Sequence, residues 1–355
     1  MTDPRAPRTG REGATGSRSR PRLARVLRIA GFILLGLGVA FAAVAAWVLG
    51  PYALRVERFR PDPERGYHAD FYVYVSPDAE RLARSGGEAV MLVQPNNSGI
   101  NSDDPEVHRK DAWWTGFGRH WLADELGVAL LVPAFVRPNE DWRIYTHALD
   151  RDVLTTGRAD LARLDLQLIA MIDAAREALA ADGVPVGDRV LIQGYSASGM
   201  FANRFTALHP ERVLAAAAGS PGAWPIAPVA EFAGEPLPYP AGIADLEVLT
   251  GRPFQADAYA RVPQLLVMGG LDTNDSVDFT DGWDPEPATQ LERLFGETPL
   301  ERWDDARALY EAAGADATFM IVDGVGHDRR ALQHHSTEFF HQILRSHRRA
   351  EDPAQ

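Results

Sequence analysis

The chain of 355 residues contains no cysteine. This absence excludes disulfide bonds, a thiolate nucleophile and any metal site that depends on cysteine ligands. It is compatible with an oxidising compartment, where a free thiol is a liability. The hydrophobic share of 46% is too high for general disorder and is enough for a sizeable buried core.

Most of the chain also lacks an excess of basic charge. The formal net charge is −13, yet residues 1–28 carry eight arginines against Asp3 and Glu12, a net of +6. The remaining residues therefore carry −19. An acidic folded part argues against nucleic acid as a partner.

Residues 29–50 contain no charged side chain. About 22 helical residues span roughly 33 Å, close to the thickness of bilayer hydrocarbon, so this stretch predicts one transmembrane signal-anchor helix. The arginine-rich residues before it predict a cytoplasmic N-terminus and an extracytoplasmic remainder in the cell membrane. Residues 1–28 are expected to form a disordered cytoplasmic tail.

Cleavage of the apolar segment is the alternative, and it would make the protein secreted. Residues 43–47 offer small side chains at A-x-A spacing, although an apolar signal core is normally about 7–15 residues long. No cysteine follows to carry a lipid, and no Arg-Arg pair precedes the apolar run as in a twin-arginine signal.

Short apolar runs alternate with amphipathic stretches through the rest of the chain. The apolar runs are typical of strands buried on both faces, and the strongest helical pattern covers residues 158–183. About five alternations with short connections predict an α/β fold, with a mainly parallel sheet covered by helices on both faces. Strands are expected at 70–75, 88–95, 128–135, 189–194, 213–220, 263–270 and 318–324, and further helices at 111–127, 196–208, 302–315 and 329–347.

One folded domain at residues 67–348, preceded by a linker at 51–66, is the simplest organisation. We find no internal repeat and no linker to a second domain. Residues 222–262 are rich in Pro, Gly and Ala and interrupt the alternation, so they predict a small cap insertion.

The segment GYSASG, residues 194–199, places two serines directly after a predicted strand and before a predicted helix. In that setting a strained turn lifts a side chain above the sheet. The turn needs small residues two positions before and two after the nucleophile, which Gly194 and Ser198 supply if the nucleophile is Ser196. For Ser198 the second of these positions would hold the bulky Met200. Ser196 is therefore the predicted nucleophile.

A serine hydroxyl becomes a good nucleophile when a histidine removes its proton and a carboxylate orients that histidine. With the serine on such a turn, the partners follow along the chain in the order acid, then histidine. Asp272 and His327 each come just after a predicted buried strand, in that order. Asp275 lies close to Asp272 and remains open as the acid, whereas Asp328 is too near His327 in sequence to orient its ring.

These motifs together resemble the α/β-hydrolase family. Within it, GYSASGMFANRFTALHPERV, GGLD and GVGH look most like the poly(hydroxyalkanoate) depolymerase and feruloyl esterase type of secreted serine esterases, over residues 67–345. The resemblance implies an α/β-hydrolase catalytic domain and an acyl-enzyme mechanism on a carboxylic ester, without a cofactor.

The chain departs from this family at the loop that binds the oxyanion. It has LVQPNNSGINSDD where these families often carry a His-Gly or Pro-Gly type of loop. Backbone N–H groups usually form the oxyanion hole, so the resemblance implies Ala197 as one donor and Asn97, or Asn96, as the other.

Other residues are weaker candidates for function. The aspartates at 272, 275, 278, 281 and 284 do not match an EF-hand loop, so a solvated loop without a metal is expected. Four tryptophans fall near the predicted catalytic rim, namely Trp113, Trp114, Trp142 and Trp224. Each is expected either to line an apolar pocket for the acyl group or to belong to the core.

The sequence predicts a membrane-anchored, extracytoplasmic serine hydrolase that acts on a small or polymeric ester. Acyl transfer to a cell-envelope acceptor by the same triad is one alternative. A non-catalytic binding protein with this fold is another, and the intact Ser196, Asp272 and His327 count against it.

Overall fold

The computed structural model describes residues 20–97, 99–222, 224–278 and 282–351. The chain divides into two compact units, Met1–Leu54 and Arg55–Gln355, and each is described by itself below.

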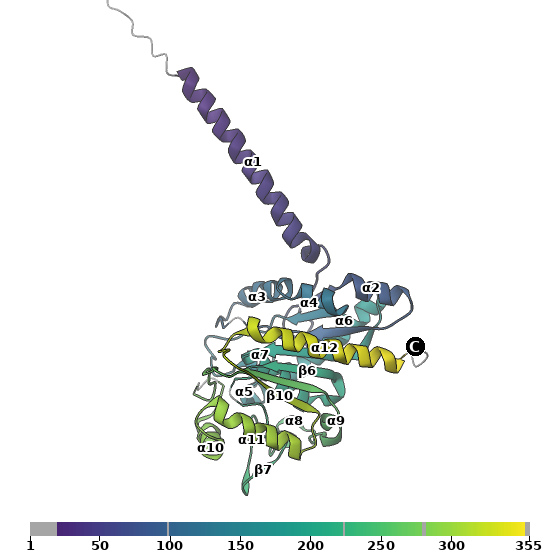
Figure 1. Ribbon diagram of the computed structural model, residues 1–355, viewed down its shortest axis with the longest axis vertical. Helices are drawn as coiled ribbons and strands as arrows, with labels where there is room; N and C mark the ends of the chain where they lie inside the picture. Colours follow the sequence, from purple (N-terminus) through teal and green to yellow (C-terminus); the bar gives the residue numbers. More distant parts are fainter. Residues whose placement is uncertain (1–19, 98, 223, 279–281, 352–355) are drawn as a thin grey trace, which may run out of the picture. The chain divides into compact units, whose positions relative to one another are not determined.

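The described residues of the first unit form helix α1 (Arg20–Ala53), drawn in purple in Figure 1. Within Leu27–Ala53 an 18-residue window reaches a mean hydropathy of 2.5, and the stretch is long enough to cross a bilayer. This length and composition fit a membrane span and also a signal sequence near the N-terminus. Residues 20–28, expected in the tail, are helical, and the rest of the predicted tail lies outside the described residues.

The second unit is built on an eight-stranded sheet in the order β1-β2-β4-β3-β5-β6-β9-β10. The pairs β1–β2 and β2–β4 are antiparallel, and every other neighbouring pair is parallel, as the sequence predicts. The carboxyl ends of the parallel strands therefore meet at one edge of the sheet. The strands are β1 (Glu57–Phe59), β2 (Phe71–Val75), β3 (Ala89–Val93), β4 (Ala129–Pro133), β5 (Val186–Tyr195), β6 (Val213–Gly219), β9 (Gln264–Gly269) and β10 (Ala317–Val322).

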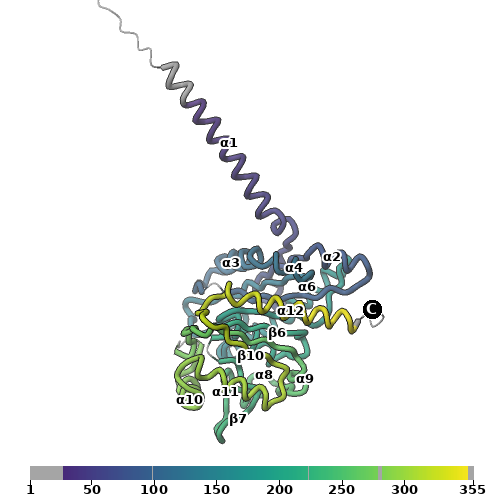
Figure 2. Tube along the Cα trace, in the orientation of Figure 1, coloured from purple at the N-terminus to yellow at the C-terminus, as the bar shows by residue number. Residues whose placement is uncertain are grey.

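Helices cover both faces of this sheet, because alternate side chains of each strand point to opposite faces. One set, including Met91, Ile192 and Met268, forms the main core with α6, α7 and α11. On the other face α3 contacts β2 and β4, while α12 contacts β6, β9 and α4 (Figure 2). The helices of these two layers are α3 (Pro105–Phe117), α4 (His120–Leu126), α6 (Leu164–Ala181), α7 (Ala197–Leu208), α11 (Pro299–Ala312) and α12 (Arg329–Glu351).

The predicted cap insertion, residues 222–262, forms small elements of its own. Some of its side chains share a separate core with α10, where Trp224 stacks on Phe295 with ring centroids 4.5 Å apart. Others, such as Tyr239 and Leu246, belong to the main core. The remaining short elements are α2 (Pro77–Arg84), η1 (Thr146–Ala148), α5 (Arg151–Thr155), η2 (Pro210–Arg212), β7 (Glu231–Phe232), β8 (Glu235–Pro236), α8 (Leu246–Thr250), α9 (Ala256–Ala260) and α10 (Pro285–Phe295).

The structure differs from the sequence prediction at two boundaries. Strand β1 pairs with β2 in register Glu57↔Val73, so the sheet begins inside the predicted linker 51–66. The helix predicted at 111–127 is interrupted at Gly118 and Arg119, which separate α3 from α4. Arg119 leaves the helical region with φ −121°, and its N–H turns back to the carbonyl of Gly116 at 3.0 Å. Gly116 and Gly118 weaken the helix there, because glycine is a poor helix former.

The turn from β5 into α7 brings two backbone segments into contact. A Cβ on Gly194 would lie 1.9 Å from the carbonyl oxygen of Ser198, and a Cβ on Gly199 would lie 2.8 Å from the carbonyl oxygen of Gly219. Backbone atoms on both sides leave no room for adjustment, so only glycine fits at these two positions without moving α7 away from the sheet.

We predict that Gly194→Ala destabilises the protein by more than about 3 kcal/mol, because its methyl group must displace the start of α7. The measurement is denaturant unfolding of the full-length chain in detergent, followed by tryptophan fluorescence. Gly157→Ala is the matched control, since a Cβ there meets nothing within 4 Å. Equal stabilities of the two variants would contradict the close approach.

Candidate active site

Ser196 lies at the apex of the turn between β5 and α7. Its backbone has φ 57° and ψ −126°, a strained combination for a residue with a Cβ. Its N–H donates to the carbonyl of Gly219 at 2.9 Å, and its carbonyl accepts from the N–H of Met200 at 3.0 Å. These bonds fix the strained residue from both sides, above the carboxyl end of β5.

The two serines of the turn have different surroundings. Ser198 is 2% exposed, and its Oγ accepts from the N–H of Tyr195 and donates to the carbonyl of Tyr195, both at 3.0 Å. Ser196 is half-buried, and its hydroxyl makes no hydrogen bond to any residue that the structure describes. The hydroxyl of Ser198 therefore closes the turn, whereas the hydroxyl of Ser196 is not used to hold it.

The side chains of Asp272, after β9, and His327, after β10, contact each other. Nδ1 of His327 lies 2.9 Å from Oδ2 and 3.1 Å from Oδ1 of Asp272. Asp272 is 2% exposed, whereas 28% of the His327 side chain reaches solvent. A carboxylate beside Nδ1 favours the tautomer with its proton there, which leaves Nε2 able to accept a proton.

The backbones of the two loops are joined directly beneath this pair. The N–H of Leu271 donates to the carbonyl of Val325, and the N–H of Gly270 donates to the carbonyl of Val322, each at 2.8 Å. A Cβ on Gly269 would lie 2.3 Å from the carbonyl oxygen of Val325. The GGLD motif is therefore needed for the loops to approach each other, and that approach aligns Asp272 with His327.

Asp272 carries a negative charge at neutral pH despite its burial. Loss of solvent would raise the pKa of this carboxyl, but hydrogen bonds outweigh that effect and hold its pKa below the usual value. The strongest of them comes from His327, and the N–H of Asn274 adds another at 2.9 Å. A charged carboxylate stabilises the imidazolium that forms when His327 accepts a proton.

Asp275, the alternative acid, is engaged elsewhere. Its two carboxylate oxygens pair with the guanidinium of Arg302 at 3.2 Å and 2.6 Å, and both side chains are buried. The carboxylate beside His327 is therefore that of Asp272, and Asp275 joins its loop to α11.

The ring of His327 also lies against the turn that carries Ser196. Its centroid is 4.7 Å from that of Tyr195, the residue before Ser196. Burial raises the pKa of the Tyr195 hydroxyl well above its usual value, so Tyr195 packs as a neutral ring. The tyrosine brings the histidine loop to the serine turn, a contact that the sequence motifs do not indicate.

The loop after β3 reaches the same turn. The side-chain amide of Asn97 donates to the carbonyl of Tyr195 at 3.0 Å. Asn96 is fully buried, where its amide donates to the carbonyl of Phe135 at 3.0 Å and its oxygen accepts from the N–H of Phe135 at 3.1 Å. Asn96 thus anchors the loop, and Asn97 contacts the serine turn through Tyr195.

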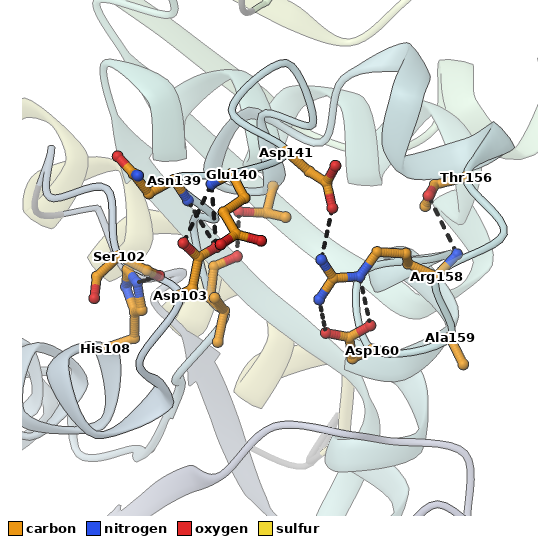
Figure 3. A network of polar contacts seen from close by, with 12 residues as sticks. Ser102, Asp103, His108, Asn139, Glu140, Asp141, Thr156, Arg158, Ala159 and Asp160 are labelled. Atoms are coloured by element: carbon orange, nitrogen blue, oxygen red, sulfur yellow. Dashed lines mark hydrogen bonds and ion pairs between the residues drawn. The ribbon is translucent and has the colours of Figure 1, made fainter.

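Further along, this loop is tied to the loop that follows β4. Figure 3 shows Asp103 accepting from the N–H groups of Asn139 and Glu140, at 3.0 Å and 3.2 Å. His108, on α3, contacts the carbonyl of Ser102 at 2.9 Å. These bonds limit the movement of the segment that carries Asn97.

A cleft of about 490 Å³ opens beside His327. Among the described residues none of its lining comes from the insertion 222–262. Of the four candidate tryptophans only Trp114 lines it, while Trp224 is fully buried in the insertion's core. The lining includes Asn97, Trp114, Arg119, Tyr195, His327 and Arg329.

The sequence analysis missed both arginines of this lining. Arg119 stood within a predicted continuous helix, and Arg329 at the start of another, where charged residues are ordinary. The one available signal was the pair of glycines, Gly116 and Gly118, which interrupts the helix immediately before Arg119.

No family model matches the chain, and no curated protein matches it. Among the solved structures that resemble it are two with 18% sequence identity. One is a poly(aspartic acid) hydrolase from Sphingomonas sp. KT-1, with a TM-score of 0.52 over 80% of this chain and 97% of that chain. The other is a poly(3-hydroxybutyrate) depolymerase from Bordetella parapertussis, with a TM-score of 0.50 over 83% of this chain and 92% of that chain. With its mainly parallel sheet covered on both faces, the chain has the α/β-hydrolase fold.

Proposed function

We propose that the protein is a serine hydrolase that cleaves carboxylic esters through an acyl-enzyme intermediate. The observation that carries this proposal is the strained Ser196 at the end of β5, with the Asp272–His327 pair brought to the same turn by the contact of His327 with Tyr195. The two solved structures of similar fold bear names of hydrolases, which agrees with this reading.

In the first half of the reaction, Oγ of Ser196 attacks the ester carbonyl while Nε2 of His327 takes the hydroxyl proton. The C–O bond to the alcohol then breaks, and His327 returns the proton to the leaving oxygen. In the second half, a water molecule gives its proton to His327 and attacks the acyl-serine. The acid leaves, and Ser196 regains its proton.

The developing oxyanion needs N–H donors that are already in place. Ala197 is the first residue of α7, so its N–H has no acceptor within the helix. Asn97 uses its side-chain amide to bind Tyr195, which leaves its backbone N–H as the proposed second donor. The 28% exposure of the His327 side chain gives water access, which favours hydrolysis over acyl transfer.

We further propose that α1 anchors the protein in the cell membrane, with the N-terminus in the cytoplasm and the catalytic domain outside. The uncharged stretch within Leu27–Ala53 and the eight arginines in residues 1–28 support this orientation.

The two serines provide the most direct test. We expect Ser196→Ala in the full-length chain to lower kcat on 4-nitrophenyl esters by about 10³-fold or more and to abolish labelling by a fluorophosphonate. Ser198→Ala is the matched control. It should keep the label on Ser196 and lose only the hydrogen bonds to Tyr195, at a cost of about 1 kcal/mol in stability.

Peptide mass spectrometry locates the label. A label on Ser198 would overturn the assignment of the nucleophile. A folded wild-type protein with neither label nor turnover would favour the non-catalytic alternative, and turnover only in the presence of an added alcohol acceptor would favour acyl transfer.

The two aspartates make a second matched pair. Asp272→Asn should lower kcat by about 10³- to 10⁴-fold, because the amide no longer holds the productive tautomer of His327, with little change in melting temperature. Asp275→Asn should instead lower the melting temperature, since it leaves Arg302 buried without a counter-ion. Values of kcat normalised to the fraction of protein that fluorophosphonate labels separate the effect on catalysis from the effect on folding. A large loss of kcat in Asp275→Asn, with little loss in Asp272→Asn, would assign the acid to Asp275.

A further inference from the structure

Arg119 is a buried arginine in the wall of the cleft beside His327. It stands at the break between α3 and α4 and is 5% exposed. Arg329, the first residue of α12, lines the same cleft. Both arginines are thus close to the proposed site of reaction, one buried and one at the surface.

The charge of Arg119 is not balanced by any carboxylate in the part of the chain that the structure describes. Its Nη1 donates to the neutral amide oxygen of Gln333, and its Nε is buried without a hydrogen-bond partner. Burial, and after it the like charge of Arg329, lower the pKa of Arg119 to about 9. Arg329 likewise has no ion pair with a described residue.

Two carboxylates line the cleft as well, and neither pairs with these arginines. Asp328 uses Oδ1 to accept from the N–H of Arg330 at 2.8 Å, at the start of α12. Asp111 lies on α3, seven residues before the chain leaves that helix at Gly118, and attraction to a carboxylate is not among the effects that set the pKa of Arg119. Nearby acidic groups therefore do not account for the buried charge.

A guanidinium removed from water without a counter-ion is unfavourable, and a carboxylate that binds it bidentately recovers much of the lost interaction. We propose that Arg119, assisted by Arg329, binds a carboxylate of the substrate, so that the protein prefers esters that carry a negative charge. This inference rests on the proposed function, because it assigns the substrate class of the same site. Trp114, 56% exposed on the same cleft, offers an apolar surface for the rest of such a substrate.

A purely structural role is the competing explanation, in which Arg119 only joins α4 to α12 through Gln333. That role would affect all esters alike. A carboxylate site affects charged esters selectively, so the decisive quantity is the ratio of kcat/KM between matched charged and neutral esters.

The experiment uses the full-length chain in detergent with two matched pairs of esters. Mono(4-nitrophenyl) adipate against 4-nitrophenyl hexanoate places the carboxylate in the acyl part. 4-Carboxyphenyl hexanoate against its methyl ester places the carboxylate in the leaving group. We expect the wild type to prefer the charged member of one pair, and that pair identifies the side on which Arg119 binds.

In Arg119→Gln the preference should fall by about 10- to 100-fold, as for the loss of a charge-assisted hydrogen bond. Arg119→Lys should restore part of it. Because Arg119 is buried and its variants can fail to fold, Arg329→Gln is a second variant at the surface, with an expected fall of about threefold or more. Arg330→Gln, an exposed neighbour outside this cleft, is the control for net charge and should leave the ratio unchanged.

Three results would overturn the inference: equal losses on both members of each pair, no preference in the wild type, or the same fall in Arg330→Gln. Fluorophosphonate labelling of each variant distinguishes this failure from that of the proposed function. A protein labelled on Ser196 that shows no charge preference disproves the carboxylate site alone. A protein without label or turnover disproves the proposed function. In that case calorimetric binding of monomethyl adipate to the wild type and to Arg119→Gln tests the carboxylate site without catalysis. Equal affinities of the two proteins would count against the carboxylate site.

Discussion

The close contact between the backbones of Gly194 and Ser198 is the constraint on which the site depends. It packs the start of α7 against the end of β5, and the chain makes this connection only by placing Ser196 at φ 57°. The strain at Ser196 is therefore a consequence of the fold. The residue is held there by its N–H, which donates to the carbonyl of Gly219, and by its carbonyl, which accepts from the N–H of Met200. A residue fixed in this way loses little freedom when it reacts, since its position is already determined.

Asp272 and His327, the proposed partners of Ser196, are also positioned by contacts between the backbones of neighbouring loops. Gly269 lets the Asp272 and His327 loops approach, and Tyr195 packs the histidine ring against the serine turn. Asn97 adds the loop after β3 through its bond to Tyr195. Tyr195 thus connects all three, which explains how residues from four strand ends converge. In the cleft beside His327, the proposed role of Arg119 would add an electrostatic preference to a site whose geometry is set by the backbone.

Much of this arrangement follows from sequence, because parallel strands bring their carboxyl ends to one edge. Ser196, Asp272 and His327 each follow an apolar run, so the sheet alone predicts that they lie at the same edge. The choice between Asp272 and Asp275 was not predictable, since it depends on Arg302, 27 residues further along the chain. Arg119 was missed for a related reason. The apolar spacing at 111–127 continues through the break, which only Gly116 and Gly118 signal, and burial of the charge arises from tertiary packing against α12.

The central claim is that Ser196 carries the acyl group during turnover. The most direct measurement mixes the full-length chain with an activated 4-nitrophenyl ester, quenches with acid during the first turnovers and determines the mass of the peptide that contains residues 194–199. The account predicts an increase equal to the acyl group, located on Ser196, which disappears as the ester is consumed. Continuing hydrolysis with Ser196 unmodified at every time point would contradict it.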